Sequence, residues 1–308
     1  MRSASQAGRS SLADLPLLAV AVVWGSSFLV VKHLATPDTV VAMLVVRFGV
    51  VLPLFGAFAW RGLRALRAAQ WRAGALLGGI LGGIFLLETY GAVHTSATNA
   101  GLIISLTMIF TPLAESLVSR TAIPRAFLGA AALSLLGVGL LTEGAGLRAP
   151  SPGDLLVLGA AVLRTVNVLA ISRGRALRGV DSAALTWVQL AFATAVFTIV
   201  SPFAGPAPWR VAAHWSAGQW GLLLYLALLC TLFAFFVQMW AVRATSPSRV
   251  SLLLGTEPLW AAVCGIALGG DRLNAVALLG GLFVLLGTEA GRRAVLPSAE
   301  PLPESVPA

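Results

Sequence analysis

Apolar residues gather along the chain in ten stretches that are near the length of a membrane-spanning helix. A hydrocarbon core of about 30 Å takes about 20 helical residues. The stretches cover residues 15–34, 40–60, 74–93, 97–118, 126–142, 154–172, 183–203, 219–240, 249–268 and 274–291. None alternates polar and apolar positions as the strands of a membrane barrel do. The pattern predicts an all-α polytopic membrane protein with ten transmembrane helices.

Composition supports this interpretation. Hydrophobic residues make up 58% of the chain and charged residues 11%, whereas soluble domains are about 45–50% apolar and about 25% charged. Arg2 and Arg9 precede the first stretch, as in a signal peptide. That stretch is nevertheless long, contains Trp24 and Lys32, and leads into another span, so we expect it to be a retained helix.

The placement of basic residues predicts the topology. With the N-terminus in the cytoplasm, most arginines fall on the cytoplasmic side, and the opposite side keeps only Lys32, Arg148, Arg210 and Arg272. This asymmetry is the positive-inside rule, which predicts two cytoplasmic ends and an even number of helices. We therefore interpret the net charge of +9 as a topology signal and expect no nucleic-acid partner.

The second part of the chain repeats the first at a shift of 150 residues. TSATNAGLIIS at 95–105 resembles TSPSRVSLLLG at 245–255. The same shift lays Glu88 on Gln238, Tyr90 on Trp240, Thr107 on Glu257 and Gly137 on Gly287. Helices three to five thus correspond to helices eight to ten, which implies two five-helix halves. Because five is odd, the halves must enter the membrane from opposite faces as an inverted repeat.

We therefore expect four segments. Residues 1–14 form a cytoplasmic tail, residues 15–142 the first repeat, residues 154–292 the second repeat, and residues 293–308, rich in Pro and Glu, a disordered cytoplasmic tail.

Inverted repeats suit a carrier, because two similar halves can exchange conformations around a central cavity. The sequence shows neither the continuous polar pore of a channel nor an enzyme's reactive constellation; it has no HExxH, and its histidines are scattered. Cys230 and Cys264 lack CxxC spacing, so we expect packing roles and no metal or other cofactor. No phosphate-binding GxxxxGK[ST] motif is present, so pumping would draw on an ion gradient or on the substrate's own gradient. A non-transporting scaffold or receptor and a lipid-active protein stay open as alternatives.

Four motifs resemble those of the EamA family of the drug/metabolite transporter superfamily. They are VVWGSSFLVVK at 22–32, RF at 47–48, TSATNAGLIISLT at 95–107 and GTEPLWAAVCGIALGGDRL at 255–273. The resemblance covers nearly the whole chain. It implies a ten-helix carrier of the inner membrane, with both ends cytoplasmic, that exports amino acids, nucleosides or other small metabolites. Glu88 and Arg164 depart from the family pattern.

Ionisable residues within membrane helices normally face protein or water, because burying a charge in lipid costs about 2.5–3.5 kcal/mol. The chain offers Arg47, Glu88, Glu115, Arg164 and Glu257. Arg47 and Glu115 lie towards the inner ends of their helices, and we interpret both as structural. Glu257 precedes Pro258 near the middle of its stretch, where it is either a cavity acid or a carboxyl that stabilises a proline kink.

The predicted substrate-binding residues are Trp24, Glu88, Asn99, Thr107, Arg164, Asn167, Gln238 and Glu257. Glu88 and Gln238 occupy matched places in the two halves. Asn99 and Thr107 form a partly polar stripe, with hydrogen bonding between helices as the alternative.

Arg164 and Asn167 are three residues apart on one helix face, and Arg164 could hold an anionic group or pair with Glu88 or Glu257. Trp24 could line the cavity or belong to a close-packing site. Carboxyls at membrane depth make protons a candidate coupling ion beside the small-molecule substrate and membrane lipids, since burial favours the neutral form of a carboxyl. The sequence leaves monomer and homodimer open.

Overall fold

The computed structural model describes residues 3–120, 122–143, 150–238, 254–271 and 274–295, and the account below refers to these residues. Their regular secondary structure is entirely helical. The first half contains α1 (Ser3–Leu34), η1 (Pro37–Thr39), α2 (Val40–Arg64), α3 (Ala68–His94), α4 (Ala97–Ile104), α5 (Thr107–Ser119) and α6 (Arg125–Glu143). The second contains α7 (Pro152–Arg173), η2 (Arg175–Leu177), α8 (Ser182–Ala204), α9 (Pro208–His214), α10 (Ala217–Leu224), η3 (Tyr225–Phe233), α13 (Glu257–Ala267) and α14 (Ala275–Val295).

Seven helical spans are long and apolar enough to cross a membrane. They are Leu15–Leu34, Pro37–Ala65, Ala68–His94, Ala97–Ser119, Pro152–Arg173, Ser182–Ala204 and Ala217–Gln238. Three shorter apolar helices cover Arg125–Val138, Glu257–Ala267 and Leu278–Gly291. The all-helical, multi-pass architecture is therefore confirmed, while ten crossings stay a prediction.

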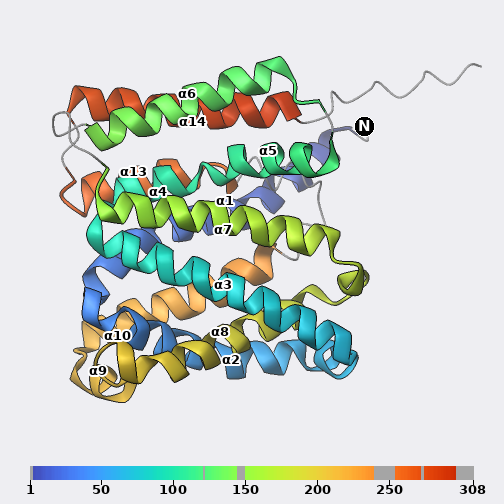
Figure 1. Ribbon diagram of the computed structural model, residues 1–308, viewed down its shortest axis with the longest axis vertical. Coiled ribbons are helices and arrows are strands. Elements are labelled where there is room, and N and C mark those ends of the chain that lie inside the picture. The colour runs from blue at the N-terminus through green and yellow to red at the C-terminus, as the bar shows by residue number, and fades with distance from the viewer. Residues whose placement is uncertain (1–2, 121, 144–149, 239–253, 272–273, 296–308) are drawn as a thin grey trace, which may run out of the picture.

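The helices lie side by side as a bundle in which the two halves interleave (Figure 1). Helix α6 packs against α14 on one flank, and α2 packs against α8 on the opposite flank. Between them, α3 contacts α7 and α8, while α13 contacts α1 and α4. Figure 1 shows α6 beside α14, α2 beside α8, and α3 beside α7. Each of these pairs joins an element of the first half to one of the second.

Local sequence sets where several helices begin. Ser151 and Asp154 form a reciprocal cap at the start of α7, where Pro152 stands at a position whose N–H needs no partner. Asp181 caps α8 by accepting a hydrogen bond from the backbone N–H of Ala184 at 2.9 Å. These caps fix the starts of two of the helices that line the cavity described below.

Two interruptions were not predicted from the apolar pattern. The stretch 97–118 divides into α4 and α5 at Ser105 and Leu106, where the Ser105 hydroxyl donates to the Leu102 carbonyl at 2.6 Å. Residues Tyr225–Phe233 form a π-helix, and within it the Thr231 hydroxyl donates to the Leu226 carbonyl at 2.9 Å. Both breaks change which side chains face the interior, because a helix's faces follow its winding.

Candidate functional site

A cavity of about 430 Å³ lies between the two halves. Its walls come from α1, α2 and α3 on one side. On the other side they come from α7, α8, η3 with the helix that follows it, and α13. The apolar lining consists of Phe28, Val31, Leu81, Ile84, Phe85, Ala92, Val168, Ile171, Leu185 and Phe235. Its volume falls in the range of small-molecule sites, which are about 300–1,000 Å³ and mostly apolar with a few placed polar groups.

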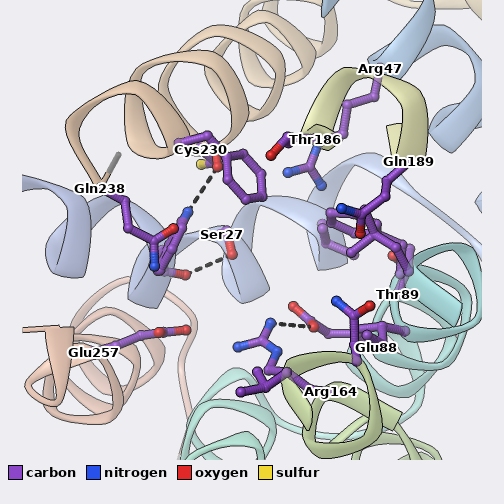
Figure 2. Close-up of a pocket in the computed structure, with 18 of the residues that line it drawn as sticks. Ser27, Arg47, Glu88, Thr89, Arg164, Thr186, Gln189, Cys230, Gln238 and Glu257 are labelled. Carbon is purple, nitrogen blue, oxygen red and sulfur yellow. Dashed lines mark hydrogen bonds and ion pairs between the residues drawn. The ribbon is translucent and has the colours of Figure 1, made fainter. Parts of the chain in front are cut away.

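Four charged residues form an alternating row across this cavity. The Arg164 guanidinium donates from Nη2 to Glu88 Oε2 at 2.9 Å, so of the two carboxylates expected as partners, Glu88 is the one paired. In Figure 2 the guanidinium lies between Glu88 and Glu257, and it interacts electrostatically with both carboxylates. Arg47 interacts in turn with Glu88. The signs therefore alternate as Arg47, Glu88, Arg164 and Glu257.

Arg47 is held on the cavity wall by polar and aromatic groups. Its side chain is only 6% exposed, and it donates from Nη2 and Nε to the Thr231 hydroxyl oxygen at 3.0 and 3.3 Å. The guanidinium carbon lies 5.4 Å from the Phe48 ring centroid and 5.5 Å from that of Phe85. Aromatic faces attract a desolvated cation, which helps to replace lost hydration. No described carboxylate forms an ion pair with Arg47, so its charge can meet a solute.

Glu257 stands at the first turn of α13 and not within a continuous helix. The turn at Gly255 and Thr256 precedes it, and Pro258 occupies an early position whose missing N–H breaks no helical bond. A negative charge at a helix N-terminus interacts favourably with the helix dipole. The carboxylate makes no hydrogen bond or ion pair with the part of the chain that the structure describes. Its side chain points into the cavity (Figure 2).

Asn167 adds a polar atom that has no hydrogen-bond partner among the described residues. Only 8% of the residue is exposed, and its Oδ1 atom is buried without a hydrogen bond to any described group. It lies one helical turn after Arg164 on α7, as the three-residue spacing predicts. Since a buried amide normally has hydrogen-bond partners, this group is suited to a solute or water.

Six of the eight predicted residues lie on the cavity wall: Trp24, Glu88, Arg164, Asn167, Gln238 and Glu257. Asn99 and Thr107 are not among the lining residues. Asn99 lies in the first turn of α4, which Ser96 caps, and the Thr107 hydroxyl donates to the Ile104 carbonyl at 2.8 Å. Trp24 lines the wall while its indole N–H donates to the Cys230 carbonyl at 2.8 Å. Binding of substrate by any of these residues stays a prediction.

Several lining residues were absent from the prediction. They are Ser27, Arg47, Thr89, Ser182, Thr186, Gln189 and Cys230. Arg47 had been interpreted as structural from its depth in the helix. Gln189 carried a usable signal, since it is a polar residue within the apolar run of α8 and is only 4% exposed.

Polar contacts close the bundle at the end where α1 and α3 finish and α7 begins. Lys32 Nζ donates to the Thr95 carbonyl at 2.9 Å, and the Thr95 hydroxyl donates to Asp154 at 2.5 Å. Nearby, the backbone N–H and hydroxyl of Thr98 donate to Asp271 at 3.0 and 2.8 Å. Asp154 and Asp271 belong to the second half, so these bonds join the two halves at this end.

The family of the chain follows from comparison with known sequences. The sequence pattern of the EamA-like transporter family matches residues 11–142 and matches again over residues 151–288. The chain belongs to the EamA-like transporter family. This result confirms the resemblance drawn from the motifs and places the EamA protein in the drug/metabolite transporter superfamily.

Two relatives from Archaeoglobus fulgidus support the assignment of the EamA protein, and each is named an uncharacterized transporter. One is 27% identical over 276 residues, which cover 89% of this chain and 83% of the relative. The other is 27% identical over 293 residues, which cover 90% of this chain and 96% of the relative. The family and these names indicate a transporter.

The fold of the EamA protein is also similar to that of a solved crystal structure. The two chains superpose with a TM-score of 0.62 at 17% sequence identity, over 91% of this chain and 96% of the other. At this identity the likeness concerns the fold alone.

Proposed function

We propose that this EamA protein is a secondary carrier that exports a small amphipathic metabolite, such as an amino acid or a related compound, across the cytoplasmic membrane by alternating access. The observation that carries the proposal is the cavity between the halves. Its volume of about 430 Å³ combines apolar walls with Arg47, Glu88, Arg164 and Glu257. Such a site can hold a solute that has an apolar body and charged or hydrogen-bonding ends.

Ten crossings in two inverted five-helix repeats are part of this proposal. The family pattern matches the chain twice, once in each half. Helices α5 and α13 begin at Thr107 and Glu257, which are 150 positions apart, and each begins directly after a turn. The seven long spans and three shorter apolar helices supply enough elements for two sets of five. We place the repeats at 15–142 and 154–292.

Helix packing offers a second line of support. The proposed correspondence pairs α1 with α7, α2 with α8, α3 with η3, and α6 with α14, and it pairs α4 and α5 together with α13. Under this correspondence, the contacts between helices recur in matched pairs. The contact of α3 with α7 then matches that of η3 with α1, and α3 with α8 matches η3 with α2. The contact of α1 with α13 likewise matches that of α7 with α5. A twofold-related pair of bundles is expected to have this property.

The two ends of the cavity differ as one stage of an access cycle requires. Bonds through Thr95, Thr98, Asp154 and Asp271 join the halves at one end. Towards the other end, the start of α8 contributes Ser182 and Leu185 to the cavity wall. With both chain termini cytoplasmic, as the distribution of arginines predicts, the joined end faces outward and this stage is inward-facing.

Proton coupling is the finer part of the proposal. Glu257 makes no hydrogen bond or ion pair with the other described residues, and the Arg164 guanidinium lies between it and Glu88. When a proton neutralises Glu257, the Arg164 guanidinium would be attracted to the Glu88 carboxylate alone. When that proton leaves, both carboxylates would attract the guanidinium. Binding of a proton would thereby alter how α13 is attracted to α7 across the cavity.

Two measurements test the carrier. Untargeted comparison of metabolites released by cells with and without the protein should reveal at least one solute exported in its presence. That solute should then cross proteoliposome membranes through the purified protein, and an imposed pH gradient should accelerate its flux.

The outcomes separate the competing functions. Equal flux with and without the pH gradient would remove the coupling and leave the carrier. Absence of any solute flux, together with unchanged behaviour of E88Q and R164Q variants, would instead indicate a scaffold or receptor. Scrambling of lipid in the same vesicles would indicate a lipid-active protein.

A further inference from the structure

A second hollow lies on the outside of the bundle, along α2 and between the starts of α3 and α8. It encloses about 680 Å³ and is open along one side. Gly49 and Ala57 from α2 contribute small residues, while Trp60, Trp71 and Trp187 contribute large aromatic walls. Among the described residues that line it, Arg64 at the end of α2 is the one that carries a charge. This surface groove is separate from the central cavity, and transport does not account for it.

The groove is built into the packing of α2, α3 and α8. Trp187 reaches across from α8 and donates its indole N–H to the Leu52 carbonyl at 2.9 Å. Gly56 leaves room for that ring, since a Cβ atom there would stand 2.8 Å from the indole nitrogen. Trp71 then meets Trp187 edge to face, with ring centroids 6.4 Å apart. Because these contacts hold the aromatic walls in place, the hollow needs no ligand in order to form.

The length of the groove corresponds to one leaflet of a bilayer. From Gly49 to Arg64 the helix rises about 22 Å at 1.5 Å per residue. Half of a bilayer, with its headgroup region, is also about 20–22 Å thick. Trp60 and Trp71 lie near the Arg64 end, where tryptophans commonly mark the membrane interface. If Arg64 lies at headgroup level, Gly49 lies near the middle of the membrane.

The charge at this end favours an anionic ligand. The Arg64 guanidinium carbon lies 4.3 Å from the Trp60 ring centroid, which holds the cation over the mouth of the groove. Arg61, Arg67 and Arg72 are exposed around the same turn between α2 and α3. Asp181 is the acidic residue nearest to this turn along α8, and it is engaged as the cap of that helix.

We propose that the groove binds an anionic phospholipid, with the phosphate on Arg64 and one acyl chain lying along α2 between Trp60 and Gly49. An acyl chain matches the narrow apolar form of the hollow, and the guanidinium matches the phosphate. A second copy of this chain matches it less well, since a twofold contact here would bring two arginine-rich turns together.

Two variants probe the two parts of the ligand. Gly49→Leu fills the deep end of the groove, and the protein can accept it because nothing lies within 4 Å of a Cβ atom placed there. Gly129→Leu on α6 is its matched control, because that glycine is equally open and lies outside the groove. Arg64→Gln removes the headgroup contact, and Arg125→Gln at the start of α6 is the matched loss of one positive charge.

The measurement is native mass spectrometry of the detergent-purified protein titrated with phosphatidylglycerol or with phosphatidylcholine. The wild type should retain one phosphatidylglycerol in preference to phosphatidylcholine. Arg64→Gln should weaken retention about fivefold, the factor expected for one basic residue at an anionic membrane surface. Gly49→Leu should weaken it by a similar factor, and both control variants should match the wild type.

Equal retention of the two lipids, or equal retention by all five proteins, would overturn the proposal. A dimer that Gly49→Leu dissociates would also overturn it, because the occupant of the groove would then be a second copy of the chain. Melting temperatures of the four variants, measured without added lipid, establish that each one is folded.

Discussion

Replacing Arg164 by glutamine is expected to destabilise the protein more than replacing Glu88. The Arg164 guanidinium stands between two carboxylates, so its loss leaves Glu88 and Glu257 without a cation between them. Loss of the Glu88 carboxylate leaves Arg164 with Glu257 as a remaining electrostatic partner. The asymmetry follows because Arg47, the other cation beside Glu88, keeps its bonds to Thr231 and its contacts with two aromatic rings when Glu88 is replaced. Glu257 has no hydrogen bond or ion pair with another described residue to compensate for the loss of Arg164.

The exposure of the pair sets the magnitude. The Arg164 and Glu88 side chains are 33% and 17% exposed, and their atoms approach to 2.9 Å. Exposed pairs contribute about 0.2–1 kcal/mol, whereas removing one partner of a fully buried pair costs about 3–5 kcal/mol. We expect the free energy of unfolding to fall by about 2 kcal/mol in R164Q and by about 1 kcal/mol in E88Q, which lie between those limits.

Thermal unfolding of the purified protein in one detergent measures these differences, at about 2–4 °C per kcal/mol. The E88Q/R164Q double variant completes the cycle that isolates the coupling between the two residues. Arg293→Gln is the control, since the Arg293–Glu289 pair at 2.6 Å joins side chains that are 75% and 36% exposed, and its loss should not change the melting temperature measurably. A larger effect of E88Q than of R164Q, or a coupling energy near zero, would contradict these assignments of partners to Glu88, Arg164 and Glu257.

Three further substitutions test other parts of the structure. Arg47→Gln should reduce solute flux in proteoliposomes about tenfold, which corresponds to a loss of roughly 1.4 kcal/mol of binding free energy. Arg47→Lys should restore only part of the flux, because lysine lacks the planar group that lies near two rings. Full activity of Arg47→Gln would remove Arg47 from the site. Thr95→Val should lower the free energy of unfolding by about 1–2 kcal/mol, since Asp154 loses the hydrogen bond that joins the halves; an unchanged melting temperature would mean that the bond contributes nothing. Gly101→Ala should lower the free energy of unfolding by about 1–3 kcal/mol, because the new methyl group meets Ala261. Gly129→Ala places its methyl group in open space and should leave the free energy of unfolding unchanged or raise it by up to about 1 kcal/mol. Equal melting temperatures of these two variants would contradict the packing of α4 against α13.

The positions of the seven long apolar spans could be predicted because hydropathy decides which segments leave water. Their interruptions could not. Asn99 and Thr107 were assigned to one stripe on the assumption of a continuous helix, and the turn at Ser105 breaks that continuity. Hydroxyl groups that bond carbonyls three residues back, as those of Ser105 and Thr107 do, bend the chain without changing its apolar pattern.

The residues of the candidate site could likewise be predicted from the sequence only in part. Arg164 and Glu88 could be proposed because an ionisable group in an apolar run stands out on its own. The position of the Arg47 guanidinium on the cavity wall depends on its hydrogen bonds to Thr231, which lies 184 positions away in the sequence, and on the nearby rings of Phe48 and Phe85. No periodicity in the sequence connects α2 with η3. Residues that look structural by depth can therefore reach a cavity once distant helices supply their partners.

The wide turns of η3 set the rotation of the rest of that helix. A π-helix pairs each N–H with the carbonyl five residues back, so it fits more residues into a turn than an α-helix does. Phe235 and Gln238 follow the π-helix and line the cavity. The winding of the π-helix therefore determines the direction, around the helix axis, in which these two side chains point. Deleting one residue between Tyr225 and Phe233 is expected to swing both side chains round by about 100°. If the cavity binds the solute as proposed, a change of length in one apolar helix would alter solute preference without replacing Phe235 or Gln238.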